Sequence, residues 1–473
     1  MIKLMNKFNH KLKLDKIIIY LIMVSNFLIL FAYLPFYQEF QLFKNADNNF
    51  QLLRFDNIYY PRLKILSWSA FILLILFLIY IIKNQDQIKN NLFNYLIFSL
   101  FILFSLSTYF ALDRFTALNG RFYRWEGFIA LAAYLFFAFL IANLVNKIDY
   151  FKIYAYLIWG AASVLSIYGI LQFFGVDFIK RDPLRENWYR AFSTFGNPNF
   201  AASFAVMILP TLIMLYLTLK KGKYKIAAFG GSSLVFAFLL TTATRGAWLA
   251  FALTVFAAIF LLFDFLKNKK KEIFKLLIVF ILIIIILNSF HGGLMGLRFI
   301  SIFHDLQDLS SAEEDEIDRV GTYRIFIYRN SLPLIMENPY LGVGPDNFAE
   351  IFPQEKYREF TGTKNRVVDK AHSEYIQLGV TTGIPALVIY LFLLLYVLYN
   401  LKPKTFNTIN LESIKGKKKF IKTTLFLSVL AYSLQAALNI SVVTVAPIFW
   451  TILGFAGAYI INYNEDDFEE ESS

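Results

Sequence analysis

The sequence contains no cysteine and only four histidines among its 473 residues. Without cysteine, the chain can form neither a disulfide framework nor a thiolate metal site. No small-x-small cleavage site follows the first apolar stretch, so we expect an uncleaved first membrane span rather than a signal peptide. Three of the histidines, His10, His291 and His304, lie in plain loop or leader sequence, which leaves His372 as the histidine with a distinctive context.

A basic domain free of apolar runs is also missing. The net charge is +12, but the lysines cluster in short connectors between apolar runs, as membrane orientation signals do. This distribution argues against nucleic-acid binding. Hydrophobic residues make up 58% of the chain, with 53 phenylalanines and 28 tyrosines, well above the level of soluble domains. Runs such as "IFKLLIVFILIIIILNSF" are long enough to cross a hydrocarbon core of about 30 Å. We therefore predict one all-α polytopic membrane domain over residues 1–473.

Hydropathy predicts about twelve membrane-spanning helices. They cover residues 16–35, 64–83, 92–112, 127–146, 152–174, 199–219, 225–242, 247–266, 273–290, 374–399, 420–440 and 444–462. Five lysine-rich connectors then fall on the same side as the N-terminus. They are residues 81–91, 146–152, 220–225, 267–275 and 401–422. The positive-inside bias predicts that this side is cytoplasmic, with both termini and the acidic tail 463–473 inside.

The opposite side carries segments rich in arginine, tryptophan, tyrosine, glycine and asparagine. The longest is residues 291–373, a large structured extracytoplasmic loop between the ninth and tenth predicted spans. Within it, Ile325, Tyr328 and Leu332 recur at helical spacing and predict a helix over about 321–337 that lies along the membrane surface. The acidic stretch 304–320 is predicted to be a solvated face rather than a cation site, because its carboxylates lack EF-hand spacing.

Three arginines on this outer side are candidates for anion binding. Arg245 lies where two predicted spans meet, and a guanidinium there is costly to bury without an anionic partner. Arg324 lies on the predicted surface helix, and Arg190 precedes the sixth span. Each has a simpler interpretation: arginines near span ends contact lipid headgroups. Asn199, in "FGNPN", can bind substrate or serve only as a turn and helix-cap residue.

His372, in "DKAHSEYIQLG", is the candidate base. A single histidine is more often a packed or surface residue, but an ordinary pKa near 6.5 lets it accept a proton at neutral pH. Asp369 and Glu374 are close enough in sequence to orient the ring or raise its basicity. Guanidinium forks bind phosphate oxygens, so the arginines can stabilise a diphosphate leaving group while His372 takes a proton from an acceptor hydroxyl.

Five stretches resemble the O-antigen ligase and O-antigen polymerase superfamily. They are "LNGRFYRWEG", "RAFSTFGNPNFAASFAVMILP", "TTATRGAWLA", "RIFIYRNSLPLIMENPYLGVGPDNF" and "DKAHSEYIQLGVTTGIPALVIY", between residues 118 and 390. The resemblance implies a GT-C-like glycosyltransferase of the bacterial plasma membrane, active in lipopolysaccharide or polysaccharide biosynthesis. It also implies an inverting reaction that needs neither metal nor cofactor. By motif match, Arg245, Arg324 and His372 correspond to the essential residues of the family.

The resemblance further implies that the donor is a glycan linked to undecaprenyl diphosphate. A ligase transfers that glycan to the lipid A core, another lipid or a protein, whereas a polymerase transfers it to another carrier-linked glycan. Two residues depart from the family pattern: Ser373 replaces a common asparagine, and Tyr328 replaces a tryptophan, so Tyr328 becomes a candidate substrate contact together with Arg190, Asn199 and Asp369. A lipid-linked glycan flippase or transporter is the lesser alternative, although it should carry charges along its spans.

Overall fold

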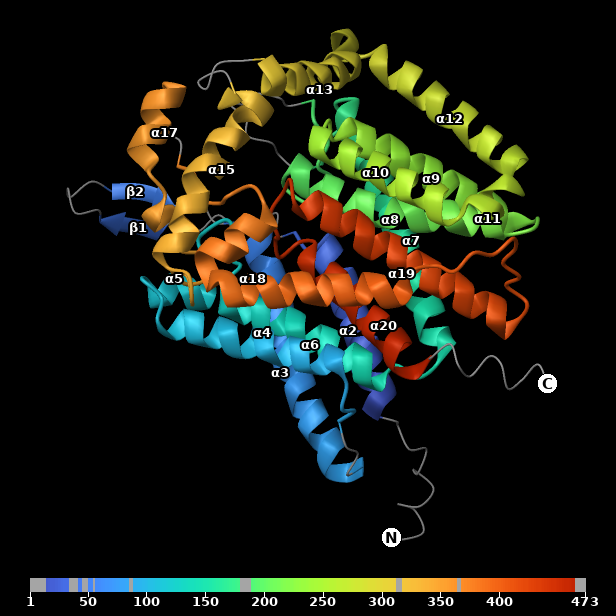
Figure 1. Ribbon diagram of the computed structural model, residues 1–473, viewed down its shortest axis with the longest axis horizontal. Coiled ribbons are helices and arrows are strands. Elements are labelled where there is room, and N and C mark those ends of the chain that lie inside the picture. The colour runs from blue at the N-terminus through green and yellow to red at the C-terminus, as the bar shows by residue number, and fades with distance from the viewer. Residues whose placement is uncertain are drawn as a thin grey trace.

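The protein is described by a computed structural model that covers residues 14–33, 41–44, 50–53, 56–84, 88–178, 189–311, 317–363 and 367–463. Within these ranges the chain is almost entirely helical (Figure 1). Seven helices have the length and hydropathy of a membrane span: α2 (Leu14–Phe31), α3 (Tyr59–Asn84), α4 (Leu92–Tyr109), α7 (Ile148–Phe173), α8 (Pro198–Thr218), α9 (Lys223–Thr241) and α18 (Glu374–Leu401).

The remaining described helices are shorter or less apolar. Three short apolar helices are α6 (Phe128–Leu144), α10 (Arg245–Leu261) and α20 (Ala446–Asn462). The others are α5 (Arg114–Asn119), α11 (Phe263–Lys267), α12 (Lys270–Asn288), η1 (His291–Gly293), α13 (Leu294–Ser311), α15 (Val320–Glu337), α16 (Phe348–Ile351), α17 (Gln354–Thr361) and α19 (Ile414–Ala436). This is a multi-pass membrane protein by helix length and hydropathy.

The prediction of about twelve spans is only partly confirmed. Each predicted range coincides with a helix, but the described residues contain seven spans, or eight if α12 and the segment after it, bent by 96°, are counted as one. The three short apolar helices have 17 residues each, about 25 Å of helix, which is less than the hydrocarbon core. Helix α19 places five lysines in its first nine residues.

The all-α prediction also missed one small element. Strands β1 (Gln41–Lys44) and β2 (Phe50–Leu53) pair antiparallel, with Gln41 opposite Leu53. They lie between the first two spans, in a segment for which the sequence analysis assigned no structure. A two-stranded hairpin is marginal on its own, so the helical class of the domain is unchanged.

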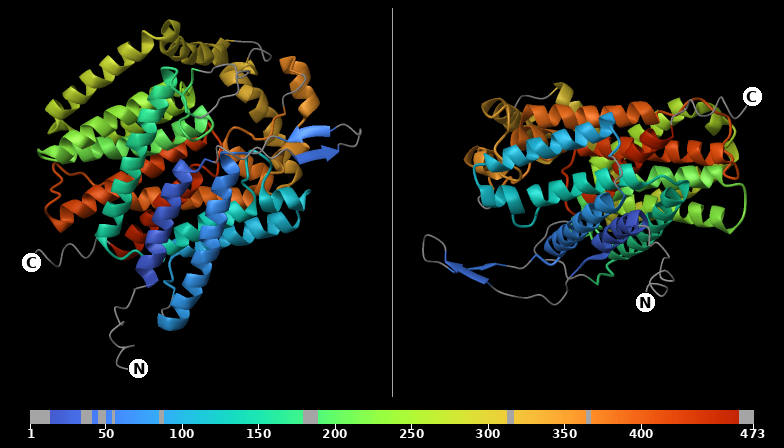
Figure 2. Two further views of the ribbon diagram at one scale, coloured as in Figure 1. Left: turned by 180° about the vertical axis from the view of Figure 1, so that it is seen from behind. Right: turned by 90° about the horizontal axis from the view of Figure 1, so that it is seen from below.

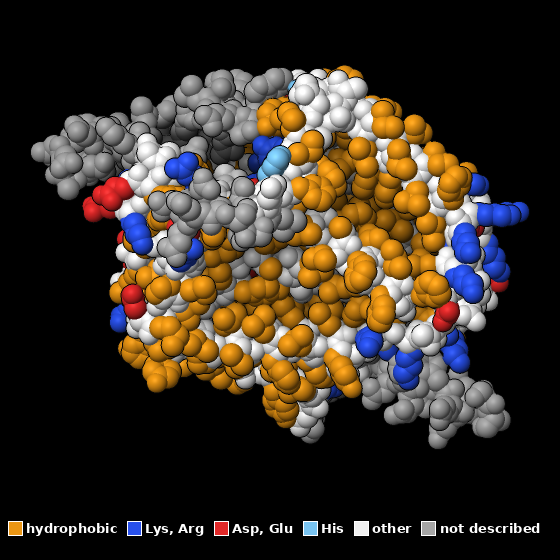
Figure 3. Space-filling model, turned by 45° about the horizontal axis from the view of Figure 1, so that its top comes forward, with side chains coloured by type: hydrophobic (Ala, Val, Ile, Leu, Met, Phe, Trp, Pro, Cys, Tyr) orange, Lys and Arg blue, Asp and Glu red, His pale blue; other side chains and the backbone are white. Residues whose placement is uncertain are grey.

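Helix α8 is the centre of the bundle. Of its most apolar window, 89% is buried inside the protein, against 17% for α3, which therefore presents most of its surface outward. Helix α8 packs on α9 and α19, α20 packs most extensively on α6, and α18 packs on α4. Helices α2, α3 and α7 cross the other long helices at a steep angle (Figure 2). Hydrophobic side chains cover most of the face in Figure 3, and lysines and arginines lie mainly at its margins.

Two glycines allow close approach of backbones. A Cβ at Gly454 of α20 would lie 2.7 Å from the carbonyl oxygen of Ala138 in α6, so a small residue is needed at this contact. Gly383 interrupts α18 with φ +84°, and a Cβ there would lie 2.4 Å from the carbonyl oxygen of Tyr340. The break in α18 thus lets the turn after α15 lie directly against it.

The two ends of the bundle differ in composition. Helices α5, α15, α16 and α17 gather at one end, together with the first residues of α8, α10 and α18 (Figure 1). The lysine-rich starts of α9, α12 and α19 lie toward the other end. Which end faces the cytoplasm stays a prediction from the lysine distribution, as does the position of α15 at the membrane surface. The acidic tail lies outside the described residues, apart from its first residue.

Candidate active site

Five turns meet at the end of the bundle that carries α5 and α15. They are residues 120–127 before α6, 190–197 before α8, 242–244 before α10, 319–323 at the start of α15 and 367–373 before α18. All predicted site residues lie in one of these turns or within about one helical turn of it. The folding of the bundle therefore brings together residues that are up to about 180 positions apart in sequence.

Arg245 is the first residue of α10, and its guanidinium is already paired within the protein. Nη1 donates to Oγ of Ser301 at 2.9 Å and lies 2.7 Å from Oδ2 of Asp305, and Nη2 donates to Oγ1 of Thr322 at 3.3 Å. Ser301 and Asp305 belong to α13, so the arginine ties α10 to the outer segment. Asp305 comes from the acidic stretch predicted to be a solvated face, and this carboxylate instead forms an ion pair.

Arg324 is the first regularly helical residue of α15, because Gly321, Thr322 and Tyr323 before it have left-handed φ angles. Its half-buried guanidinium forms no hydrogen bond or ion pair with the part of the chain that the structure describes. A Cβ at Gly246 would lie 3.5 Å from its Nη1, which places Arg324 beside the start of α10. Burial, and secondly the charge of Arg245, lower the pKa of Arg324. An anion bound here would relieve both effects.

Arg190 and Asn199 are joined to each other. The guanidinium of Arg190 donates to the carbonyl oxygen of Thr242 at 2.8 Å, to Oγ1 of Thr244 at 3.0 Å and to Oδ1 of Asn199 at 3.1 Å. Asn197 caps α8 by accepting from the backbone N–H of Asn199 at 2.8 Å. These bonds hold the turn before Arg245 against the start of α8. A direct substrate contact for either residue stays a prediction.

A fourth arginine, Arg298 of α13, was missed by the sequence analysis. Its guanidinium donates to the carbonyl oxygen of Ala243 and to the hydroxyl of Tyr189, both at 3.3 Å. Burial first, and then the charges of Arg298, Arg324 and Arg245, lower the pKa of Arg190 to about 10. The four guanidinium groups therefore act on one another electrostatically. An arginine in a largely apolar stretch of the outer segment was the signal that could have identified it.

His372 lies at the start of α18 in a left-handed conformation, with φ +56°. The hydroxyl of Tyr328 donates to its backbone carbonyl at 3.0 Å, so this tyrosine holds the backbone of the histidine. Among the described residues, no hydrogen bond to either ring nitrogen is found. Burial lowers the pKa of His372 to about 4, assisted by the charges of Arg324 and Arg124, and the carboxylate of Asp369 only partly offsets this. Burial therefore moves this pKa well below the ordinary value of 6.5 from which the sequence analysis started.

Asp369 is engaged by Arg124, a second arginine that the sequence analysis did not select. Nε of Arg124 lies 2.6 Å from Oδ2, and Nη2 lies 3.0 Å from Oδ1, a bidentate pair. Burial raises the pKa of Asp369, but Arg124, together with Lys370 and His372, outweighs it, so the pKa is lowered overall. Arg124 stands in "LNGRFYRWEG", one of the stretches with the family resemblance, and this was the available signal.

Glu374 does not orient the imidazole. Its carboxylate accepts from the hydroxyl of Tyr390 at 2.6 Å and from that of Tyr432 at 2.9 Å, both inside the bundle. The expectation that Glu374 acts on the ring of His372 is therefore wrong. Two buried tyrosine hydroxyls satisfy this carboxylate where α18, α19 and the adjoining helices pack.

A buried group of three charges lies behind the turn that carries His372. Nζ of Lys370 lies 2.7 Å from Oδ1 of Asp346 and 3.3 Å from Oε2 of Glu126. Burial lowers the pKa of Lys370, but the two carboxylates outweigh it and raise the pKa overall. Oδ2 of Asp346 also accepts from the backbone N–H groups of Arg121 and Glu126. These contacts link three segments: Glu126 lies before α6, Lys370 before α18 and Asp346 after α15.

Backbone strain is concentrated at the same place. Nine described non-glycine residues have positive φ: Tyr123, Trp125, Ser193, Ala243, His291, Thr322, Tyr323, Asp346 and His372. Apart from His291, Asp346 and His372, each of them lies within three residues of Arg124, Arg190, Arg245 or Arg324. Such conformations cost on the order of 1–3 kcal/mol each and cluster at functional sites, where the surrounding structure enforces them. The strained positions are therefore concentrated around the predicted site residues.

Comparison with family models finds a match in the chain. Residues 230–391 match the model of the Wzy_C family, described as O-Antigen ligase. The matched segment begins in α9 and ends in α18, so it contains Arg245, Arg324 and His372, while Arg124 and Arg190 precede it. The family resemblance predicted from the sequence is thereby confirmed. A search of curated proteins finds no match to the chain.

Proposed function

Residues 230–391 are an O-antigen ligase family domain, and from this premise we propose that the protein is a membrane glycosyltransferase. It transfers a glycan from undecaprenyl diphosphate to the hydroxyl of a surface acceptor, such as the lipid A core or another glycan. Two observations carry the proposal. Neither the guanidinium of Arg324 nor the ring nitrogens of His372 have a hydrogen-bond partner among the described residues, and the charge of Arg324 acts on the imidazole of His372.

The diphosphate of the donor fits the four arginines of this site. Two phosphates carry concentrated negative charge, and guanidinium groups bind phosphate oxygens with two parallel hydrogen bonds. The guanidinium of Arg324 can bind a phosphate without first losing a partner among the described residues. Arg245 is shared with Asp305, so a phosphate that enters the site competes with that carboxylate for the same nitrogens. The protein thus keeps its cationic cluster partly neutralised until the donor arrives.

The reaction follows from these roles. The acceptor oxygen attacks the anomeric carbon, the bond between that carbon and the phosphate oxygen breaks, and the lipid diphosphate leaves with the bonding electrons. A nitrogen of His372 accepts the acceptor proton as the new glycosidic bond forms. Because the charges of Arg324 and Arg124 contribute to the low pKa of His372, a bound diphosphate offsets them and makes the imidazole a stronger base. Direct attack of this kind inverts the anomeric configuration.

A pair of histidine variants tests the role of His372. His372→Ala should abolish glycan transfer and leave the protein folded, because Tyr328 bonds the backbone carbonyl rather than the ring. His291→Ala is the control: its Nε2 lies 2.9 Å from the carbonyl oxygen of Phe173 and its ring packs against Tyr189, so its loss should leave transfer largely unchanged. Wild-type transfer by the His372→Ala variant would remove the imidazole from the base role.

The same site serves a ligase or a polymerase, and the fate of the glycan in a deletion strain separates the two. Loss of a ligase leaves long glycan chains attached to the lipid carrier. Loss of a polymerase leaves single repeat units that still reach their final acceptor. We propose the ligase because the matched family is described as O-Antigen ligase. Unchanged surface and carrier-bound glycans would contradict both assignments.

A further inference from the structure

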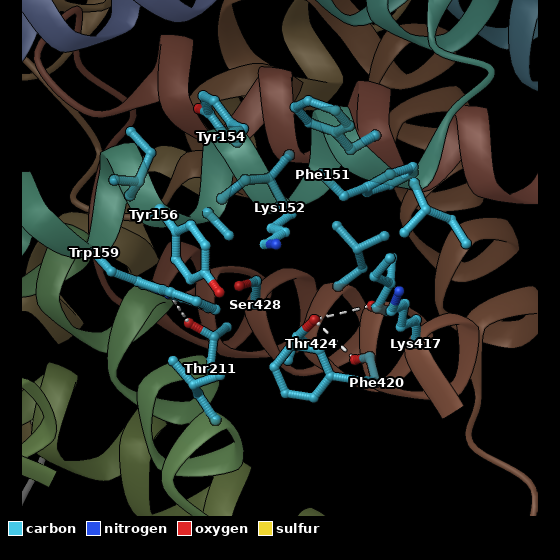
Figure 4. Close-up of a pocket in the computed structure, with 18 of the residues that line it drawn as sticks. Phe151, Lys152, Tyr154, Tyr156, Trp159, Thr211, Lys417, Phe420, Thr424 and Ser428 are labelled. Atoms are coloured by element: carbon cyan, nitrogen blue, oxygen red, sulfur yellow. Dashed lines mark hydrogen bonds between the residues drawn. The ribbon is translucent and has the colours of Figure 1, made fainter. Parts of the chain in front are cut away.

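A cavity of about 290 Å³ lies between α7, α8, α19 and α20, close to the small end of the range for ligand pockets (Figure 4). It is lined by residues of the second half of α8 and by Leu219 just after it, whereas the candidate active site contacts the first residues of that helix, near Asn199. Asn199 and Thr211 are twelve residues apart, about 18 Å along the helix axis. The cavity is therefore separate from the site of the proposed reaction.

The walls of the cavity offer little to a polar ligand. Most of the lining is aliphatic or aromatic. The indole N–H of Trp159 donates to Oγ1 of Thr211 at 2.8 Å, Oγ of Ser428 donates to the carbonyl of Met207 at 3.0 Å, and Oγ1 of Thr424 donates within its own helix. Since these polar groups are already satisfied, the interior suits an apolar chain.

The rim of the cavity carries positive charge. Lys152 of α7 and Lys417 of α19 line the opening from opposite sides (Figure 4). Both lysines are exposed, and neither ammonium group forms a hydrogen bond or ion pair with the described residues. Asp149 also lines the rim, which leaves a net charge of +1 from these three residues. The first turns of α7 and α19 both reach the rim, so two positive helix ends add to the field.

We propose that this cavity binds an anionic phospholipid, with one acyl chain between α7 and α19 and its phosphate between Lys152 and Lys417. The apolar interior selects a chain, and the two ammonium groups select an anion, so the ligand must be an amphiphile with a negative head. Lysine-rich connectors dominate this end of the bundle, where anionic lipids of the adjoining leaflet are attracted. The bound lipid fills the gap between two helices that otherwise touch little.

Native mass spectrometry of the purified full chain tests the head-group contact. After delipidation, the protein is offered phosphatidylglycerol and phosphatidylcholine with identical acyl chains. The wild type should retain phosphatidylglycerol about tenfold more, and Lys152→Ala/Lys417→Ala should retain the two lipids about equally. Lys221→Ala/Lys415→Ala removes two exposed lysines at the same end that do not line the cavity, and should keep the preference. Equal behaviour of the two double variants would overturn the proposal.

A larger side chain inside the cavity tests whether an acyl chain binds there. Ala155→Phe places a ring in the cavity with both lysines intact, and should reduce the binding of both lipids by about tenfold. Thr424→Phe, on the facing helix, repeats the test if the first variant is not monodisperse. Wild-type lipid binding by a folded, filled variant would place the lipid elsewhere. Complete displacement of phosphatidylglycerol by an equimolar fatty acid of the same chain would show that the occupant is a free fatty acid, and the phospholipid assignment would fail.

Discussion

Arg124 and Asp369, 245 positions apart in sequence, form a bidentate ion pair with nitrogen–oxygen distances of 2.6 and 3.0 Å. Arg124 lies in the turn before α6, and Asp369 lies three residues before His372. The pair therefore fixes the turn that carries the proposed base to a distant part of the chain. Its side chains are about one-fifth exposed, so solvent screens the interaction only partly.

Asp369→Asn should weaken this connection. A neutral amide cannot match the guanidinium charge, and hydrogen bonds to charged groups contribute about 1.5–3 kcal/mol. We expect the free energy of unfolding in detergent to fall by about 2 kcal/mol and glycan transfer to fall at least tenfold, with kcat more affected than KM. Chemical denaturation and transfer kinetics measure the two effects.

The control for this variant is Glu350→Gln. Arg121 and Glu350 form a pair of similar length, 2.7 Å, at the same end of the bundle, but Glu350 is about half exposed. Exposed pairs contribute at most about 1 kcal/mol, so this change should be nearly silent. Equal losses in the two variants would mean that Asp369 has no special role in holding the site.

Lys370→Met should destabilise the protein more than any surface substitution. It leaves Asp346 and Glu126 buried without a cation, and breaking such a buried arrangement costs about 3–5 kcal/mol. Lys220→Met is a matched control, because Lys220 and Glu412 are separated by the same 3.3 Å as Lys370 and Glu126 but are about three-quarters exposed. Thermal unfolding in detergent should show a large drop for the first variant and almost none for the second. Similar unfolding temperatures would refute a stabilising role for the buried group.

The fold was predictable where hydropathy alone decides it. Every predicted span coincides with a helix, because long apolar segments in lipid must satisfy their backbone groups internally. The number of spans was not predictable in the same way. Helices α6 and α20 are largely buried by neighbouring helices, whereas α10 leaves most of its apolar side chains exposed or half-buried, and apolar composition does not separate these two surroundings. The bend of 96° after α12 likewise depends on local backbone geometry around η1.

Single residues of the candidate site could be predicted from the sequence, but their hydrogen-bond and ion-pair partners could not. Arg245, Arg324 and His372 stand out because charged or titratable residues are rare in such a chain. Their partners are ordinary in sequence: Arg124, for example, meets Asp369 only after the whole bundle has folded. The pKa of His372 shows the same limit, since its main cause is burial, which depends on packing rather than on neighbouring residues.

The pH dependence of transfer should reveal the low pKa of His372. The imidazole can accept a proton only above its pKa, which burial and the nearby arginines lower to about 4. The acid limb of kcat/KM, which reports the free enzyme, should therefore fall near pH 4 rather than 6.5. The acid limb of kcat should lie at higher pH, because the bound diphosphate offsets the nearby arginines.

Arg124→Gln tests whether the nearby positive charge lowers the pKa of His372. Removal of this positive charge, with Asp369 left unpaired, should raise the pKa of His372 and move the acid limb of kcat/KM upward. Arg121→Gln, which changes an arginine that does not act on the imidazole, should leave the limb in place. A wild-type limb near 6.5, or identical limbs in the two variants, would show that burial and arginine charges do not set the basicity of His372.

Arg245→Lys should impair transfer although it keeps the positive charge. Two guanidinium nitrogens of Arg245 contact Ser301, Asp305 and Thr322, and a single ammonium group cannot span these partners while it also binds a phosphate. We expect kcat/KM to fall about 10–100-fold. Arg114→Lys, at an exposed position where the guanidinium lies 5.0 Å from the ring centroid of Tyr109, should have no effect. If Arg245→Lys transfers glycan at the wild-type rate, position 245 requires only charge, and the planar fork has no part in diphosphate binding.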